Sequence, residues 1–192
     1  MKLASLITQI RGVSYKPSNI KSINDGLPIL RANNINENKI NFNDLIYIDS
    51  SKIQVNQFLK SGDILICTSS GSKELVGKAA VFDKYISSVS FGAFCKVVRI
   101  NKNEDINDDF IRLFFKSKIY RNQISELSKG ANINNIKTED IDNLIINIPE
   151  LSIQEKAVKD LTILNNALDS KKLELSHLDE LIKSRFMCQE AM

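Results

Sequence analysis

Apolar residues repeat every three or four positions in the last fifth of the chain, from Ser152 to about Met187, a stretch without glycine or proline. This spacing is typical of the a/d seam of a coiled coil. Ser152 and Glu155 also match a capping box, which predicts the start of the helix. A helix of this length spans about 50 Å, more than a compact domain needs, so we expect it to bind a partner helix. The seam consists of Leu161, Leu164, Leu168, Leu175, Leu178 and Ile182, with Lys171 at its one polar position.

Shorter apolar segments, separated by polar turns, precede this helix. A run with three- and four-residue spacing predicts a helix over 108–127, capped by Asn107 or Asp108, and Thr138 caps a further helical turn. The predicted strands lie at 3–10 (after a helical turn), 28–32, 45–48, 64–68, 79–82, 94–100 and 144–148.

These elements predict an α+β fold. The runs at 64–68, 79–82 and 94–100 are the best candidates for a central sheet. We expect one globular domain at 1–150 with a small mixed sheet. A hinge at Pro149 to Leu151 and a long C-terminal helix at 151–192 follow, the helix forming an antiparallel coiled coil.

Composition limits the classes of protein to consider. The chain has 192 residues, of which 43% are apolar and 26% charged, as in an ordinary globular protein. No apolar run reaches the roughly 18 residues of a membrane span, and no signal peptide is evident, which favours a soluble cytoplasmic protein. Three scattered cysteines and one histidine do not form a zinc-ligand set, so we expect free, buried thiols.

The net charge of +3 is unevenly distributed. Residues 1–150 carry 20 Lys and Arg against 16 Asp and Glu, whereas residues 151–192 carry 6 against 7. The globular part is therefore mildly basic, which permits a polyanionic partner without requiring one.

The sequence matches no known catalytic motif. The segment from Gly71 to Lys78 has five residues between its glycines where a Walker motif has four, and Ala79 replaces the magnesium-binding Ser or Thr. The glycine spacing around Phe91 is not that of a methyl-donor site, and His177 lies among charged residues of the terminal helix. We therefore predict no catalytic residues and no metal site.

Polar loops are the remaining candidates for function. Their Arg, Lys, Asn and Ser side chains can contact phosphates and base edges, although the same residue types are common in any loop and, taken alone, fit that explanation better. The candidate DNA-binding residues are Lys16, Arg31, Asn33, Asn34, Ser70, Ser72, Lys73, Lys78, Lys129, Asn132, Asn134 and Asn135.

An ordered set of motifs, which spans nearly the whole chain, resembles the target recognition domain of type I restriction-modification specificity (S) subunits. The motifs are Arg11-Gly12-Val13-Ser14-Tyr15-Lys16-Pro17, Leu30-Arg31-Ala32-Asn33-Asn34-Ile35, Gly62-Asp63-Ile64-Leu65-Ile66, Ser70-Gly71-Ser72, Gly77-Lys78-Ala79-Ala80, Gly92-Ala93-Phe94, Ile148-Pro149-Glu150-Leu151 with Gln154-Glu155, and the leucine helix ending Ile182-Lys183-Ser184-Arg185-Phe186.

This resemblance implies a non-catalytic subunit of a restriction system that reads one half of a split site in double-stranded DNA. It also implies that the long helix packs against its counterpart as a spacer. The partners would be methyltransferase (M) subunits, which bind S-adenosylmethionine, and through them the restriction (R) subunits. The chain itself would hold no cofactor.

A full S subunit resembles two tandem copies of domain and helix, and this chain has one. The single copy is explained by a half-subunit that forms a homodimer or by a truncated chain. A second hypothesis is an adaptor or anti-restriction decoy that docks the methyltransferase through the helix without reading DNA. Salt-dependent DNA binding distinguishes the two.

Overall fold

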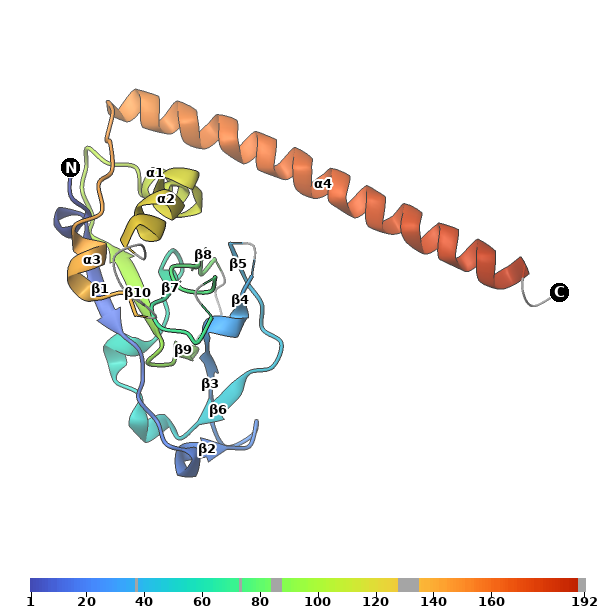
Figure 1. The fold of residues 1–192 in the computed structure, drawn as a ribbon, viewed down its shortest axis with the longest axis horizontal. Coiled ribbons are helices and arrows are strands. Elements are labelled where there is room, and N and C mark those ends of the chain that lie inside the picture. Colours follow the sequence, from blue (N-terminus) through green and yellow to red (C-terminus); the bar gives the residue numbers. More distant parts are fainter. Residues whose placement is uncertain (37, 73, 84–87, 128–134, 190–192) are drawn as a thin grey trace. The chain divides into compact units, whose positions relative to one another are not determined.

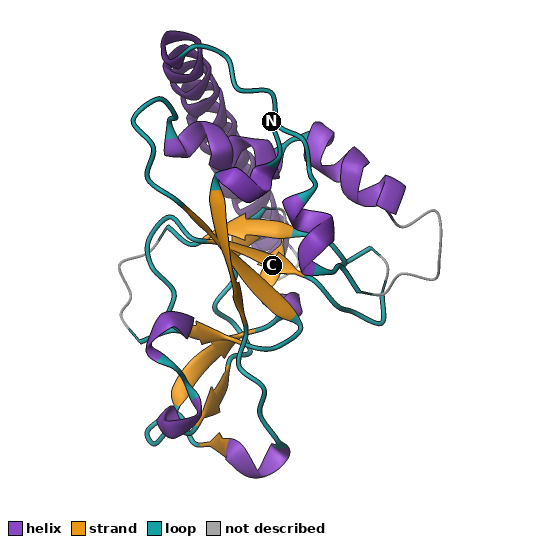
Figure 2. Cartoon of the chain, turned by 90° about the vertical axis from the view of Figure 1, so that its left-hand side faces the viewer, coloured by secondary structure: helices purple, strands orange, loops and turns teal. Residues whose placement is uncertain are grey.

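The computed structural model describes residues 1–36, 38–72, 74–83, 88–127 and 135–189. Contacts divide the chain into two units, residues 1–148 and 149–192. Within the first unit, α1, α2 and α3 lie toward one end and β2, β3 and β6 toward the other (Figure 1). Figure 2 shows the strands of this unit in two groups.

Four antiparallel strands form the central sheet of the first unit, in the order β1-β10-β7-β8. The strands are β1 (Ile7–Arg11), β7 (Ile64–Cys67), β8 (Ala79–Val81) and β10 (Cys95–Ile100). The three predicted central strands are confirmed, and the strand predicted near the N-terminus adds the fourth.

Strand β7 is apolar at every position of its sequence. Its four residues are fully buried because both faces of the sheet are covered. Ile64 and Ile66 pack into a core with the helices, whereas Leu65 and Cys67 pack into a second core on the opposite face. Cys67 and Cys95 lie opposite each other as buried free thiols, and burial raises the pKa of Cys67 to about 11.

Helices cover one face of this sheet. They are α1 (Asp108–Lys116), α2 (Lys118–Leu127) and α3 (Thr138–Asp142). The predicted Asn107 cap is confirmed, since its side-chain oxygen accepts from the N–H groups of Asp109 and Phe110 at 2.8 and 3.2 Å.

The prediction of one continuous helix over 108–127 is wrong at Ser117, which has extended backbone angles. Its hydroxyl donates to the Phe114 carbonyl at the end of α1 and accepts from the Tyr120 N–H at the start of α2. One serine thus caps both helices, which lets the chain change direction without leaving these buried groups unpaired.

A second, mixed sheet has the order β2-β6-β3-β9, with β3 and β9 parallel. Its strands are β2 (Ile20–Lys21), β3 (Leu27–Leu30), β6 (Ile46–Ile48) and β9 (Ser90–Phe91). A separate hairpin joins β4 (Ile35–Asn36) to β5 (Lys39–Ile40). Residues of β3, β4 and β9 pack against the second face of the central sheet. Short 3-10 helices complete the unit: η1 (Leu3–Ser5), η2 (Pro17–Asn19), η3 (Ala32–Asn34), η4 (Ser50–Lys52) and η5 (Val55–Gln57).

The strand predicted over 144–148 is also wrong, since this segment makes one isolated bridge, Lys2 to Ile145. It runs beside the N-terminus, where the N–H of Leu3 donates to the carbonyl of Leu144 and the amino group of Met1 donates to the carbonyl of Ile146. The neighbouring segment turns into η1 at Leu3, so no continuous ladder forms.

A buried ion pair accounts for the Gly62-Asp63 motif. Asp63 is 2% exposed and accepts two hydrogen bonds from the Arg99 guanidinium, at 2.8 and 2.6 Å. Gly62 has a φ of +90°, which favours glycine, and its carbonyl accepts from Arg112. The motif thus ties the start of β7 to β10 and α1.

The second unit contains one helix, α4 (Leu151–Gln189), as predicted. It begins one residue before the predicted start, because the carbonyl of Glu150 accepts from the N–H of Gln154 at 3.1 Å. Ser152 is the second helical residue and therefore not the N-cap that the capping box predicted. The six predicted seam residues are between 42% and 62% exposed.

Candidate nucleic-acid interface

The turn Gly92–Phe94 lies between β9 and β10 and hydrogen-bonds to three other segments of the first unit. The N–H of Gly92 donates to the carbonyl of Leu30 at 2.9 Å, and the N–H of Ala93 donates to the carbonyl of Val13 at 3.0 Å. The Phe94 carbonyl accepts from the N–H groups of Thr68 and Ser69 at 2.9 and 3.1 Å. This central turn thus holds together the chain that follows β1, β3 and β7.

Gly12 permits the close approach of the chain after β1. A Cβ atom at Gly12 would collide with the carbonyl of Gly92. The N–H of Val13 can therefore donate to the Phe91 carbonyl at 2.8 Å, and Val13 pairs with Gly92 in a parallel bridge. The glycines of two separate sequence motifs thus meet in one backbone contact.

The loop after β7 also meets the chain that precedes α3. Ser69 and Asn135 form an isolated antiparallel bridge, and the N–H of Ile136 donates to the carbonyl of Thr68 at 2.7 Å. The exposed Asn135 therefore lies beside Ser69 and, through it, close to the central turn.

Side chains of β1 and β10 anchor α3 at both of its ends. Lys96 Nζ donates to Thr138 Oγ1 at 2.7 Å, and Gln9 Nε2 donates to Asp142 Oδ1 at 2.7 Å. Burial and the neighbouring positive charge of Arg11 lower the pKa of Lys96, although Asp142 and Asp140 oppose this shift. These bonds hold α3, which begins three residues after Asn135, against the central sheet.

The structure therefore brings the segments that carry several predicted residues to or near the central turn, and we call these residues together the loop face. Serine hydroxyls and asparagine amides there can hydrogen-bond to base edges or phosphates, and the cations can neutralise phosphates. The central turn adds Phe94 and the loop after β7 adds Ser69. The loop face comprises Arg31, Asn33, Ser69, Ser70, Ser72, Lys78, Phe94 and Asn135.

Two of the candidate residues also serve the fold. Asn34 is 1% exposed; its Nδ2 donates to the carbonyls of Asn41 and Asn43, and its Oδ1 accepts from the N–H of Arg31. These contacts assign Asn34 to the loop's own structure rather than to a DNA contact. Arg31 forms an ion pair with Asp44 at 2.9 Å, and its buried Nε has no hydrogen-bond partner.

Asn33 shares the carboxylate of Asp44 with Arg31, at 3.0 Å. Lys16, in contrast, is exposed where the chain leaves the central turn for β2, and its N–H donates to Asn19. No contact joins it to the loop face within the described residues. Four predicted DNA-binding residues, Lys73, Lys129, Asn132 and Asn134, lie outside the described residues.

Phe94 is the aromatic residue of the loop face, and the sequence did not predict it as a DNA contact. Its side chain is 70% exposed, whereas Phe91 and Cys95 on either side are fully buried. The alternation over 94–100 placed Phe94 in the strand, but β10 begins at Cys95. The preceding Gly92-Ala93 pair was the available signal, since a glycine before a strand is typical of a turn.

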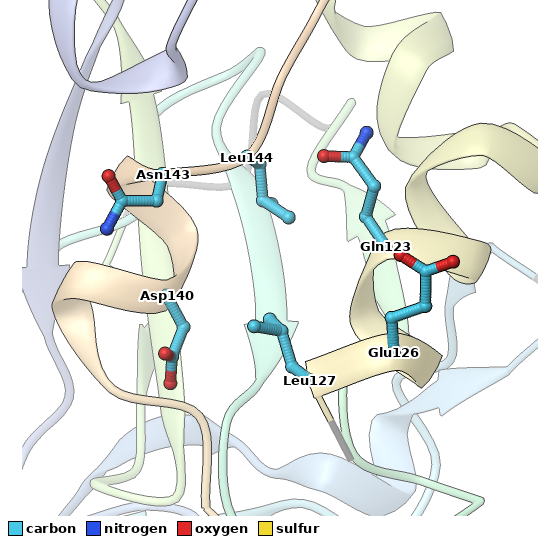
Figure 3. A pocket seen from close by; sticks show the side chains of 6 residues that line it. All are labelled: Gln123, Glu126, Leu127, Asp140, Asn143 and Leu144. Carbon is cyan, nitrogen blue, oxygen red and sulfur yellow. The ribbon is translucent and has the colours of Figure 1, made fainter. Parts of the chain in front are cut away.

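Two hollows lie elsewhere in the first unit. One, of about 290 Å³, lies between α2 and α3 and is lined by Gln123, Glu126, Leu127, Asp140, Asn143 and Leu144 (Figure 3). Its two carboxylates disfavour phosphate. The other, of about 440 Å³, follows the edge of β1 and is lined by Thr8, Gln9, Ile10, Arg11, Gln54, Asn56, Gln57 and Arg99. Its amides and Arg11 are hydrogen-bonding groups, and Gln57 Nε2 donates to the Arg11 carbonyl at 3.0 Å.

Among the described residues, no group of three or more His, Cys, Asp or Glu side chains is placed to hold a metal ion. No helix in that part of the chain has the length and apolar character to cross a membrane.

Comparison with known proteins identifies the family. The family model described as the type I restriction modification DNA specificity domain matches residues 2–178. The chain is 40% identical over 183 residues to the type I restriction enzyme StySPI specificity subunit of Salmonella potsdam. It is also 40% identical over 185 residues to the EcoKI specificity subunit of Escherichia coli K12.

Each match covers 94% of this chain and 39% of the relative, so the chain spans well under half the length of these relatives. The crystal structure of the HsdS subunit from Thermoanaerobacter tengcongensis is similar in fold, with a TM-score of 0.63 and 20% identity. That similarity covers 88% of this chain and 38% of the other. The chain therefore belongs to the family of type I restriction modification DNA specificity domains.

Proposed function

We infer that this chain is a sequence-reading component of a type I restriction-modification system, and that the first unit reads one half of a bipartite DNA site. The observation that carries this proposal is the convergence of the chain after β1, β3 and β7 on the central turn, in a chain whose family model covers residues 2–178. Several hydrogen-bonding side chains around one turn offer the set of donors and acceptors that base-specific readout requires.

Within the loop face, the side chains divide by chemistry. Lys78 and Arg31 are suited to phosphate, which sets position and gives salt-dependent affinity. Ser70 and Asn135 are suited to base edges, where an asparagine amide can form two hydrogen bonds with adenine. Substitution of Lys78 should weaken binding to all sequences, whereas substitution of Asn135 should relax the choice of base at one position.

In this proposal the chain performs no chemistry itself. Methylation and cleavage belong to the methyltransferase and restriction subunits with which it assembles, and the methyl donor S-adenosylmethionine binds to the methyltransferase. The relatives that carry the name specificity subunit support this division of labour.

The exposed seam of α4 supports a homodimer in which two copies of this helix pack antiparallel. In such a pair, an a position of one helix faces a d position of its partner. One register places Leu161 opposite Leu178 and Leu164 opposite Leu175, on both sides of a two-fold axis. Ala157 then faces Ile182, so the apolar layers extend outward from the centre.

Lys171 falls next to the axis in this register, opposite Leu168 and about 2 Å from the centre along the helix. Shifting the helices by one heptad would place Leu161 opposite Arg185 and lose apolar layers at both ends. Lys171 forms an ion pair with Glu174 of its own helix at 2.8 Å, which partly neutralises the lysine. The favoured register therefore has a polar centre, which specifies alignment at a cost in affinity.

Two domains joined in this way would lie about 50 Å apart, or about one and a half turns of DNA. Because the two-fold axis relates identical domains, the site should be an interrupted palindrome.

A mobility-shift assay of the chain with its methyltransferase tests the proposal. We expect binding that weakens steeply between 50 and 200 mM salt, as for several phosphate contacts. Binding to the methyltransferase without any salt-dependent DNA binding would instead support the adaptor or decoy.

A further inference from the structure

Phe94 is held in its exposed position by the backbone around it. The Phe94 carbonyl accepts from Thr68 N–H at 2.9 Å, Ser69 N–H at 3.1 Å and Thr68 Oγ1 at 3.2 Å. The next residue, Cys95, is fully buried, and its N–H donates to the Gly92 carbonyl at 2.9 Å. The turn is therefore tied on both sides of Phe94, and its 70% exposed ring is part of the folded structure.

The surroundings of Phe94 are polar. Ser69 and Ser70 lie near the start of the loop between β7 and β8, beside Phe94, and Asn135 forms a β-bridge with Ser69. A rigid aromatic ring next to hydroxyl and amide groups suits a ligand that is apolar at one point and carries hydrogen-bonding groups around that point. A DNA base pair has this character, since its edge offers donors and acceptors while the thymine methyl and the base faces are apolar.

We propose that Phe94 is the apolar base-contacting residue of the loop face, and that it adds to sequence specificity by packing against a thymine methyl or the face of a base. This inference rests on the proposed function, because it requires that the loop face bind DNA. Both contacts bury the ring against base carbon atoms, and both depend on the sequence at one step of the site.

The test compares Phe94→Ala with Ile23→Ala in the full chain bound to its methyltransferase. Ile23 is 66% exposed and lies in the turn between β2 and β3, so it is a matched control for the loss of exposed apolar surface. The probes are a duplex carrying the site found by methylation profiling and a duplex of unrelated sequence. Thermal melting checks the fold of each variant.

We expect Phe94→Ala to weaken binding to the specific duplex about tenfold or more, equivalent to about 1.4 kcal/mol. Binding to the unrelated duplex, binding to the methyltransferase and the melting temperature should be unchanged. Ile23→Ala should bind both duplexes as the unsubstituted chain does.

Two modified duplexes distinguish the two apolar contacts. If the ring packs on a thymine methyl, replacing that thymine by uracil weakens the unsubstituted chain but not Phe94→Ala. If the ring packs on a base face, 2-aminopurine at that step brightens on binding the unsubstituted chain and not on binding Phe94→Ala.

Equal binding of the specific duplex by Phe94→Ala and the unsubstituted chain would overturn the proposal for Phe94 and leave DNA reading intact. Selective loss of methyltransferase binding would also overturn it and make Phe94 a protein contact. If the unsubstituted complex binds neither duplex, the proposed function itself fails.

Discussion

Leucine is used in opposite ways in the two units of this chain. Leu65 in β7 is fully buried in the second core, whereas Leu175 in α4 is 62% exposed with its seam neighbours. The first unit buries the apolar residues of its central strands within its own fold, whereas α4 leaves its seam exposed. A helix of 39 residues with an exposed apolar seam is stabilised by association, because isolated helices gain most of their stability from packing.

The largest expected effect is from charge placed in the seam. Leu164 and Leu175 face each other across the proposed pair, so the double variant Leu164→Glu/Leu175→Glu puts like charges together in an apolar layer. We expect the dimer to dissociate completely at micromolar concentration, as measured by sedimentation. The double variant Ile163→Glu/Leu173→Glu is the control, since these residues are each 58% exposed and lie off the seam. Dissociation of the control to the same extent would show that the seam is not the interface.

Truncating one side chain in each unit sharpens the comparison. Ile66→Ala, in the core beneath the helices, should lower the free energy of unfolding of the first unit by about 2–5 kcal/mol. Leu178→Ala should leave that unit's stability unchanged and weaken only self-association. Chemical denaturation followed at several protein concentrations separates the two effects, because only the second depends on concentration. A concentration-independent loss of stability in Leu178→Ala would contradict the account.

Lengthening α4 tests its role as a spacer. Duplicating residues 157–163 adds one heptad before the rest of the seam in each helix, and so moves the two domains apart by about 20 Å in total. At roughly 3.4 Å per base pair, the spacer of the recognised site should grow by about six base pairs while both half-sites stay the same. Methylation profiling of the variant measures the spacer; a changed half-site sequence would count against this division of roles.

The smallest expected effect is at the polar centre of the seam. Lys171→Leu completes the apolar repeat and removes two lysines from near the axis, so the dimer should tighten about tenfold, or about 1.4 kcal/mol. Lys172→Leu is the control, because this residue is adjacent and off the seam. Equal tightening in both variants would refute the proposed register.

Local sequence signals predicted the elements with strong periodicity. The sequence predicted both the seam of α4 and the run of four buried residues in β7. Ser117 was missed because α1 and α2 share a helical period, and the serine that separates them is polar without being a glycine or proline. The two-residue strands, such as β4 and β9, were missed because they are too short to show alternation.

The sequence predicted which residue types form the candidate site, but only some of the individual residues. Asn34 and Asn135 are the same residue type in similar asparagine-rich loops, yet one is buried in its own loop and the other is exposed. The bonds of Asn34 to Asn41 and Asn43 within its own loop, and the long-range bridge from Ser69 to Asn135, decide this difference. Residue type alone does not encode them.

Methylation profiling of DNA from cells that carry this chain together with its methyltransferase tests the central claim most directly. We predict methylation at an interrupted palindrome, with identical half-sites separated by a fixed spacer, that disappears when the chain is deleted. An asymmetric site would contradict the paired arrangement, and methylation that persists without the chain would contradict its role in reading DNA.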